Sequence, residues 1–488
     1  MAAVEPHSGK SISMIPTSYG LGRLRSPWLE HCTLAIGGGS VRSIYASFAR
    51  ALTKVPFEEE FMIRSQLAIV VAALGLTLAG TAMAQDTSAG LRVGAAKIDI
   101  TPPADAGVPM NAYDHEKLYL RAIVMDNGST KGVLIGADLG GINEEVWADA
   151  SQQISTDLKI PVANIIMTSV HTHSDWPANA TTAVGQPRYG SDFVADRSIE
   201  AVREAMSKLA PAKVGYGKGE AYLNVNRDTI DDKTKLWTQA ANTGAPSDKA
   251  VSVLSFIGED GQPIAAYASY AMHPVNGYLA GFVSGDFAEA TTSWVEKAFG
   301  GGMVTIFSQA PSGDQNPRWL RTGTNALASK SGVKINGYEM TREPVEAPLR
   351  NKKVEDGPLD PAVGRQLGDY MQALGIILGE EVIRTMSRTE NFDGTPELWG
   401  KQATITCLGR KRLDNAREGV AGQFEDGPDI DIRLGVLGIG DVAIATTNAE
   451  IYTRIGQKAI ERSPMANTMY VTLANGRANS GYILDDES

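Results

Sequence analysis

Two histidines separated by one residue are the first candidates for chemistry in this chain. His171 and His173 lie in "NIIMTSVHTHSDW" (164–176), directly after a short apolar run that is typical of a buried strand. The whole chain has only 6 histidines in 488 residues. On extended backbone, a spacing of two places both side chains on the same side, where their nitrogens could converge on one metal ion or one water molecule. The pair alone is equally compatible with one hydrogen-bonded imidazole and one surface imidazole.

A third histidine and an acidic residue could complete such a site. His273 follows a strand-like apolar segment, and Pro274 ends regular pairing there. Imidazole nitrogen suits Zn²⁺, and a catalytic zinc site holds about three or four nitrogen or oxygen ligands and keeps a position for water. Glu450 in "ATTNAEIYTRIG" lies where an apolar strand meets a helix, so its carboxylate could point into a cleft. The alternative is a helix-start charge that the helix dipole favours.

These residues need a framework that brings distant segments together. Apolar runs and turn signals predict strands or hairpins over 91–103, 121–138, 163–170, 250–274, 301–317, 401–415 and 431–447. The last two of these segments are predicted to be separate hairpins. Helical periodicity predicts helices over 143–157, 193–209, 286–298, 361–387 and 451–461. Residues 318–360 are polar and rich in glycine and proline, which indicates an irregular excursion or lid. Because strands and helices mix without a strict βαβ rhythm, we expect an α/β mixed domain with helices outside a mixed sheet.

The N-terminal part of the sequence predicts export. Residues 62–84, "MIRSQLAIVVAALGLTLAGTAMA", combine a positive start, an apolar stretch and a small-residue cleavage site that ends at Ala84. We therefore expect a signal peptide and a secreted or periplasmic protein, with a mature domain over 85–488. Residues 1–61 are then most economically a non-native upstream extension, with Met62 as the true initiator. The alternative is a membrane anchor with a short cytoplasmic arm.

The composition limits the classes of partner. An apolar content of 43% and a charged content of 21% are ordinary for a globular protein and allow a sizeable core. The net charge of −11 argues against a nucleic-acid partner, because phosphate binding needs a basic face. Ser312 in "PSGD" lacks the flanking glycines of a serine-hydrolase elbow, so serine-nucleophile chemistry is not expected. We expect a small-molecule substrate instead.

Six short segments occur in the order and approximate spacing of one known family. They are "VGAAKIDITPP", "SVHTHS", "HPVNGYLAGFVSGD", "QAPSGDQNP", "TTNAEIYTRIG" and "ANSGYI". Across about residues 91 to 484, they resemble the catalytic N-terminal domain of the neutral, non-lysosomal ceramidase family. The resemblance implies a secreted or membrane-associated zinc amidohydrolase that cleaves the N-acyl bond of ceramide. It also implies a single large domain of two mixed sheets between outer helical layers, an α/β/β/α arrangement, here without the family's C-terminal β-sandwich domain.

The resemblance also assigns roles to individual residues. The family's zinc ligands fall on His171, His273, Glu450 and Tyr482. The second histidine of the motif, His173, would lie beside the metal-bound water, where a neutral imidazole could relay the proton and later protonate the leaving amine. Coordination would favour the phenolate form of Tyr482, whose oxygen is a hard donor. His115 matches a family histidine for which we expect a structural part.

The family's active-site arginine falls on Arg227 of the Asn226-Arg227 pair. Its guanidinium could stabilise a developing oxyanion or hold a substrate carboxylate. The segment "GDQNPR" stands where ceramidases carry "GDVSPN", so Asn316 replaces a serine that contacts the substrate. An amide side chain can still form hydrogen bonds but cannot act as a nucleophile. Asp314 in the same segment is expected to line the substrate pocket.

A second departure from the family follows the histidine pair. The glycine-rich "HTHSGPGG" becomes "HTHSDWPA", so Asp175 and Trp176 would narrow the substrate pocket and add a charge. Three functions remain open at this point. The chain could hydrolyse a ceramide-like amide, with membrane-surface contact through the lipid. The same zinc site could act on a glycan or another polar N-acyl or ester compound. The chain could also be a non-catalytic binding protein on this scaffold.

Overall fold

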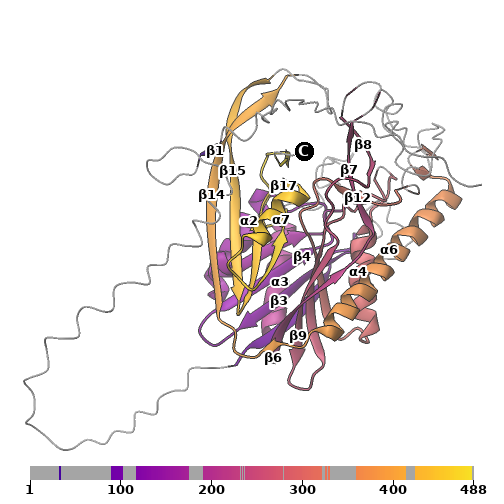
Figure 1. The fold of residues 1–488 in the computed structure, drawn as a ribbon. Coiled ribbons are helices and arrows are strands. Elements are labelled where there is room, and N and C mark those ends of the chain that lie inside the picture. The colour runs from indigo at the N-terminus through magenta and orange to yellow at the C-terminus, as the bar shows by residue number, and fades with distance from the viewer. Residues whose placement is uncertain are drawn as a thin grey trace, which may run out of the picture.

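The molecule consists of two β-sheets packed face to face with helices on their outer sides, as the computed structural model shows (Figure 1). The structure describes residues 32–33, 90–102, 117–174, 191–230, 237–278, 280–320, 359–413 and 424–485, with a few isolated residues between these ranges. Within them, the expected mixed α/β fold with two sheets and outer helical layers is confirmed.

The larger sheet runs in the order β11-β10-β9-β6-β2-β3-β4-β5, and β13 pairs with β6. Its strands are β2 (Arg92–Asp99), β3 (Tyr119–Asp126), β4 (Lys131–Ala137), β5 (Ile165–Ser169), β6 (Ala210–Glu220), β9 (Ala250–Gly258), β10 (Pro263–Tyr270), β11 (Val304–Gln309) and β13 (Phe392–Asp393). Most neighbours are antiparallel, but β4–β5 and β10–β11 are parallel. The expected β3–β4 hairpin turns at Asn127 and Gly128, where Gly128 takes the positive φ that glycine tolerates.

The second sheet runs in the order β1-β14-β15-β16-β18. Its strands are β1 (Cys32–Thr33), β14 (Leu398–Arg412), β15 (Phe424–Ile439), β16 (Val442–Thr447) and β18 (Asn467–Val471). The prediction of a hairpin within 401–415 was wrong, because this segment is one continuous strand that pairs with β15. The strand pairing shifts register between Cys407 and Gly409, so the glycine lies at an irregularity within the strand and not in a turn.

Alternating side chains of the central strand β3 build both cores. Ile123 and Met125 point toward the second sheet and pack in one cluster with Leu437 and Ile444. Leu120, Ala122 and Val124 point the other way, toward the helices. The helices are α2 (Glu144–Leu158), α3 (Ser191–Ser207), α4 (Asp286–Ala298), α6 (Pro361–Arg388) and α7 (Thr453–Glu461), with a short 3₁₀ turn, η2 (Val162–Asn164).

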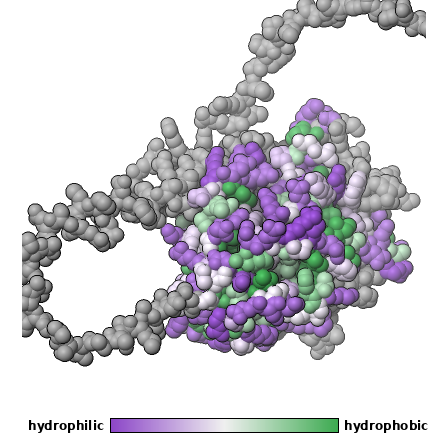
Figure 2. Space-filling view, turned by 60° about the horizontal axis from the view of Figure 1, so that its bottom comes forward, coloured by the Kyte–Doolittle hydropathy of each residue, from purple (hydrophilic) through white to green (hydrophobic). Residues whose placement is uncertain are grey.

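The helices divide between the two outer faces. Helices α2 and α3 pack on one half of the larger sheet, while α4 and α6 lie side by side on its other half (Figure 1). Helix α7 covers the outer face of the second sheet. On the face that Figure 2 shows, hydrophilic residues surround smaller hydrophobic patches. Among the helices of the described ranges, none is both long and apolar enough to cross a membrane.

Two small sheets at the ends of the large strands carry residues of the candidate site. The first joins β12 (Gln315–Pro317), β7 (Asn224–Ile230) and β8 (Trp237–Asn242) in the order β12-β7-β8. The second is the parallel pair β17 (Glu450–Ile451) and β19 (Tyr482–Ile483). Both connect segments that are far apart in the sequence, so the site can form only in the folded chain.

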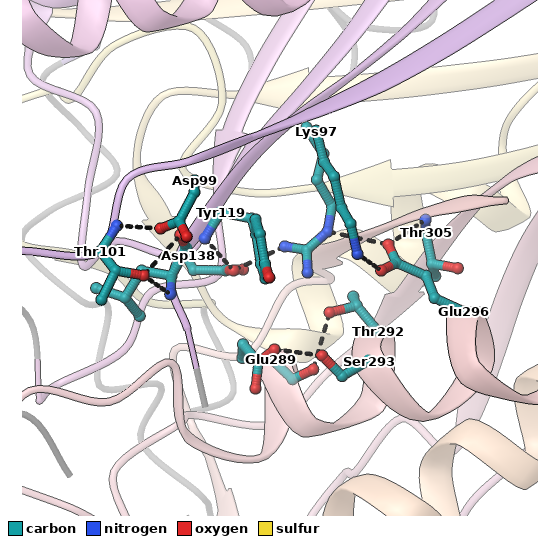
Figure 3. A network of polar contacts seen from close by, with 12 residues as sticks. Lys97, Asp99, Thr101, Tyr119, Asp138, Glu289, Thr292, Ser293, Glu296 and Thr305 are labelled. Atoms are coloured by element: carbon teal, nitrogen blue, oxygen red, sulfur yellow. Dashed lines mark hydrogen bonds and ion pairs between the residues drawn. The ribbon is translucent and has the colours of Figure 1, made fainter. Parts of the chain in front are cut away.

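A buried ionic network joins the larger sheet to α4 (Figure 3). Arg121 on β3 donates to Asp138 over 2.7 Å and to Glu296 on α4 over 3.2 Å. Glu296 also pairs with Lys97 and accepts a backbone hydrogen bond from Thr305. The Arg121 side chain is 2% exposed, and burial raises the pKa of Asp138 although Arg121 opposes the shift. Because Arg121, Asp138 and Glu296 are buried beside one another, removing the guanidinium would leave the carboxylate of Asp138 uncompensated.

Candidate metal and catalytic site

Three histidine rings from two distant segments meet at one end of the sheets. The ring centroids lie 4.9 Å apart for His171 and His173, 5.0 Å for His171 and His273, and 5.6 Å for His173 and His273. One potential ligand atom of each lies within 4.8 Å of the others. A backbone hydrogen bond from His173 N to Pro274 O, 2.9 Å long, ties the two segments together. The structure thus gathers the histidines that the sequence placed at strand ends.

The backbone at His171 differs from the sequence-based expectation. We expected extended backbone through the histidine pair, but His171 has a φ of +66°, in the left-handed region that few residues other than glycine adopt. Hydrogen bonds hold this conformation: the backbone N–H donates to Leu139 O over 3.0 Å, and the ring contacts Gly140 O. The convergence of the two rings therefore depends on the loop after β4. Such strain persists where the surrounding structure fixes it, as at functional sites.

Backbone carbonyls fix the tautomers of two of the histidines. His171 Nδ1 lies 2.9 Å from Gly140 O, and His273 Nδ1 lies 3.1 Å from Gln315 O. Because a carbonyl oxygen can only accept, Nδ1 carries the proton in each ring, and in the neutral imidazole Nε2 then presents a lone pair. Burial, followed by the charge of Arg227, lowers the pKa of His273 to about 4. This ring is therefore neutral at pH 7.

Glu450 completes a converging set of donor atoms. Its Oε2 atom lies 3.4 Å from Nε2 of His171 and 3.4 Å from Nε2 of His273. Burial alone would raise the pKa of this carboxyl, but the interactions with His171 and His273 outweigh burial and hold the pKa far below its ordinary value. The group is therefore a carboxylate. The parallel register of β17 and β19 sets Tyr482 directly opposite Glu450, with its hydroxyl 3.5 Å from His273 Nε2.

The arrangement of these atoms fits a bound cation. Nε2 of His171, Nε2 of His173 and Oε2 of Glu450 are buried and have no hydrogen-bond partner among the described residues. Lone pairs and a negative charge that face one another at such distances repel unless a proton or a metal ion lies among them. Two imidazole nitrogens, a carboxylate oxygen and a nearby phenol oxygen are the donor types of a divalent metal site. The residues present therefore fit a metal ion.

His173 differs from the other two histidines in its surroundings. Burial lowers the pKa of His173 well below its ordinary value, and the neighbouring His171 and His273 lower it further. Its ring also meets the edge of Tyr278, with centroids 5.8 Å apart. A neutral imidazole with a buried Nε2 that lacks a described partner can accept a proton.

Arg227 lies on β7 beside the histidines. Its Nη1 donates to Asn316 Oδ1 over 3.2 Å, its Nη2 donates to Gly313 O over 2.6 Å, and its guanidinium carbon lies 5.1 Å from the centroid of the Tyr482 ring. The Nε atom of Arg227 is buried without a described partner. The expected neighbourhood of Arg227 and Asn316 is thus present, and Asn316 orients the guanidinium through its amide oxygen.

Both carboxylate oxygens of Asp314 accept hydrogen bonds within the protein. Its Oδ2 accepts from Asn226 over 2.8 Å, and its Oδ1 accepts from the backbone N–H of Thr453 over 2.9 Å. Both oxygens therefore join β7 to the start of α7, and the expected place of Asp314 in the substrate pocket stays a prediction. The expected pocket residues Asp175 and Trp176 lie outside the described residues, as do His115 and residues 330–358 of the expected lid.

Sequence reasoning missed several parts of the site. The carbonyl groups of Gly140 and Gln315 orient the histidine rings, but a backbone atom leaves no mark in the residue type. Arg477 donates to Glu450 Oε1 over 3.3 Å. Its position in "ANGRANSGYI", five residues before Tyr482, was the one signal that could have drawn attention to it.

Comparison with known proteins shows the family to which the chain belongs. Residues 91–338, just over half of the chain, match the family described as "Neutral/alkaline non-lysosomal ceramidase, N-terminal". The chain belongs to this family. The resemblance inferred from the six sequence segments is thereby confirmed, and the low identities below mark a divergent member of the neutral ceramidase family.

The identities to individual relatives are low. Neutral ceramidase of Pseudomonas aeruginosa is 25% identical over 302 residues, which are 57% of this chain and 43% of that protein. Neutral ceramidase A of Dictyostelium discoideum is 24% identical over 224 residues, 42% of this chain and 31% of that protein. The chain therefore spans less than half the length of these curated relatives. The crystal structure of the Pseudomonas aeruginosa enzyme has a TM-score of 0.59 at 17% identity, over 81% of this chain and 68% of that one, and shows a shared fold.

Proposed function

We propose that the protein is a secreted or periplasmic zinc-dependent hydrolase that cleaves an N-acyl amide bond, with a ceramide-like lipid as the simplest substrate. One observation carries the proposal: Oε2 of Glu450 lies 3.4 Å from Nε2 of both His171 and His273, and this oxygen and Nε2 of His171 are buried without a hydrogen-bond partner among the described residues. Membership of the neutral ceramidase family supports the choice of an amide bond. Export would follow from the signal-like segment 62–84, with cleavage after Ala84.

The proposed ligands are His171, His273, Glu450 and Tyr482. Two imidazole nitrogens, one carboxylate and one phenol oxygen form a donor set that suits Zn²⁺. Burial raises the pKa of Tyr482, and Arg227 opposes the shift, so the hydroxyl is protonated at neutral pH until a cation lies beside it. When bound, zinc would act as a Lewis acid and lower the pKa of water from 15.7 to about 7.

The remaining polar residues divide the other tasks. His173 would take the proton of the attacking water on Nε2 and return it to the leaving amine, because its imidazole is neutral and buried. Arg227 would donate its free Nε–H to the oxygen that becomes negative at the scissile carbonyl. Asn316 would keep the guanidinium in place by accepting from Nη1.

A second substrate class is favoured by one observation. Asn316 stands where ceramidases carry a substrate-contacting serine, and its amide oxygen is engaged by Arg227. A site altered in this way could accept a glycan or another polar N-acyl or ester compound. Contact with a membrane surface belongs only to the lipid alternative.

Metal analysis and substrate assays test both proposals. We expect purified protein to contain zinc and to release fatty acid from short-chain or long-chain ceramides, and chelation should abolish the release until zinc is restored. Zinc without release of fatty acid, but with turnover of other N-acyl compounds, would select the second substrate class. Protein that binds no metal and cleaves neither class would be a non-catalytic binding protein. N-terminal sequencing of the exported protein checks cleavage after Ala84.

A further inference from the structure

The two carboxylate oxygens of Glu450 have different surroundings. Oε2 faces the Nε2 atoms of His171 and His273, whereas Oε1 accepts a hydrogen bond from Nη2 of Arg477 over 3.3 Å. We infer that Arg477 is a positioning residue of the proposed metal site: it holds Oε1 and thereby presents Oε2 alone to the ion. This inference rests on the proposed function, because Glu450 must be a metal ligand for its orientation to matter. Glu450 is the one carboxylate among the proposed ligands.

The backbone around Arg477 is fixed on both sides. Asn475 exchanges two hydrogen bonds of 2.8 Å with Met167 on β5, one through its backbone N–H and one through its side-chain oxygen. Ala478 donates its N–H to Asn448 O over 2.8 Å. Asn475 and Gly476 both have positive φ, +64° and +94°, so the chain turns sharply just before Arg477. A residue on such a bend is held in place before any metal binds.

The Arg477 side chain also lies against the loop that orients His171. A Cβ atom added at Gly141 would come 3.5 Å from Nη1 of Arg477, an ordinary contact distance, so the guanidinium lies against this loop. The preceding carbonyl, Gly140 O, accepts from Nδ1 of His171. Arg477 therefore spans from one proposed ligand, Glu450, to the loop that fixes another.

The physical effect follows from carboxylate geometry. A carboxylate that is free to rotate can offer either oxygen or both, whereas one with Oε1 hydrogen-bonded offers a single oxygen in a fixed direction. Residues that hold metal ligands in this way change metal affinity by about 10- to 100-fold when they are removed. The Arg477 side chain is 48% exposed, so its direct contribution to folding stability is small, and its main effect falls on Glu450, which is 11% exposed.

The chain supplies a matched control. Arg384 on α6 pairs with Glu381, and the two side chains are 46% and 11% exposed, nearly the same as Arg477 and Glu450. Glu381 has no place among the proposed metal ligands. Replacing Arg384 by methionine therefore removes an equivalent ion pair without touching the proposed site.

The test is zinc affinity of the purified full chain, measured by competition with a chromogenic chelator, together with the visible spectrum of the Co²⁺-loaded protein. We expect Arg477→Met to raise the zinc Kd about 10- to 100-fold and to change the Co²⁺ spectrum. Arg477→Lys should lie between Arg477→Met and the unsubstituted protein, because a lysine keeps the charge but not the planar fork. Arg384→Met should leave both readouts unchanged. The melting temperature of metal-free Arg477→Met should match that of the unsubstituted protein.

The outcomes distinguish the role of Arg477 from the existence of the zinc site. If the unsubstituted protein binds zinc and Arg477→Met binds it equally well with the same Co²⁺ spectrum, the inference is overturned while the proposed function stands. If the unsubstituted protein binds no zinc, the proposed function fails and the inference fails with it. If Arg384→Met weakens zinc binding as much as Arg477→Met does, the effect is not specific to Glu450 and the inference is also overturned.

Discussion

The Oε2 atom of Glu450 lies 3.4 Å from the Nε2 atom of His171. This contact joins β17, which follows the second sheet, to the segment that leaves β5 of the larger sheet. The proposed metal would therefore bridge the two sheets, and binding should depend on their being packed together. An ion that binds the folded chain and not the unfolded chain stabilises the fold by mass action.

Zinc should therefore raise the thermal stability of the protein. At a free zinc concentration of 100 times Kd, the expected stabilisation is about 2.7 kcal/mol. His171→Asn removes one ligand and should abolish most of this increment while leaving the stability of the metal-free protein similar. Thermal unfolding of both proteins, with zinc and with chelator, measures the difference.

A second variant keeps this experiment interpretable. Arg384→Met removes an ion pair with Glu381, and neither residue is among the proposed ligands. We expect its zinc-dependent stabilisation to equal that of the unsubstituted protein. An increment that survives in His171→Asn would rule out His171 as a ligand.

His173 and His273 should respond differently to substitution. All three histidines offer ligand atoms within 4.8 Å, so distance alone does not separate a ligand from a proton carrier. If His173 carries the proton, His173→Gln should lower kcat by about 10²- to 10⁴-fold and leave the zinc content near one ion per chain. His273→Gln should lower both. Metal analysis beside the activity assay tells these cases apart, and loss of zinc from His173→Gln would make His173 a ligand instead.

Much of the fold followed from residue patterns. The two apolar runs on either side of Asn127-Gly128 predicted the first hairpin, and the helix predicted over about 286–298 is α4. The prediction over 401–415 failed because Gly409 is a turn signal locally, while the ladder with β15 continues past it. Long-range pairing overrode the local signal there.

The site was predictable in its residue types but not in its geometry. The histidine pair and Glu450 could be named because their side chains carry the chemistry. The left-handed backbone of His171 and the carbonyl of Gly140 could not, since both arise from the loop after β4 meeting the end of β5. The hydrogen bonds of Asp314 to Asn226 and Thr453 could not be predicted either, because they join segments far apart in the sequence.

The buried network around Arg121 should be important for stability. Arg121→Met would leave Asp138 buried without its cation and Glu296 with Lys97 alone, and breaking a buried pair in this way costs about 3–5 kcal/mol. Equilibrium urea unfolding should show this loss as a lower transition midpoint. Lys117→Met removes an exposed pair with Asp99 and should barely move the midpoint. Equal midpoints for the two variants would mean that the network contributes no net stability.

Arg227 and Asn316 should act together on the transition state and not on metal binding. Arg227→Lys keeps a positive charge but cannot donate to Gly313 O and Asn316 Oδ1 while presenting Nε–H to the substrate. We expect kcat to fall about 10²- to 10³-fold, the usual effect of losing one oxyanion donor, with zinc content unchanged. Asn316→Leu keeps Arg227 but removes the acceptor that orients it, so a smaller fall in kcat is expected. The double variant should lose little more than Arg227→Lys alone, because Asn316 acts through Arg227. Steady-state kinetics of the three variants on whichever amide the protein cleaves decides the matter: fully additive losses would show that Asn316 contacts the substrate independently, as the serine at this position does in ceramidases.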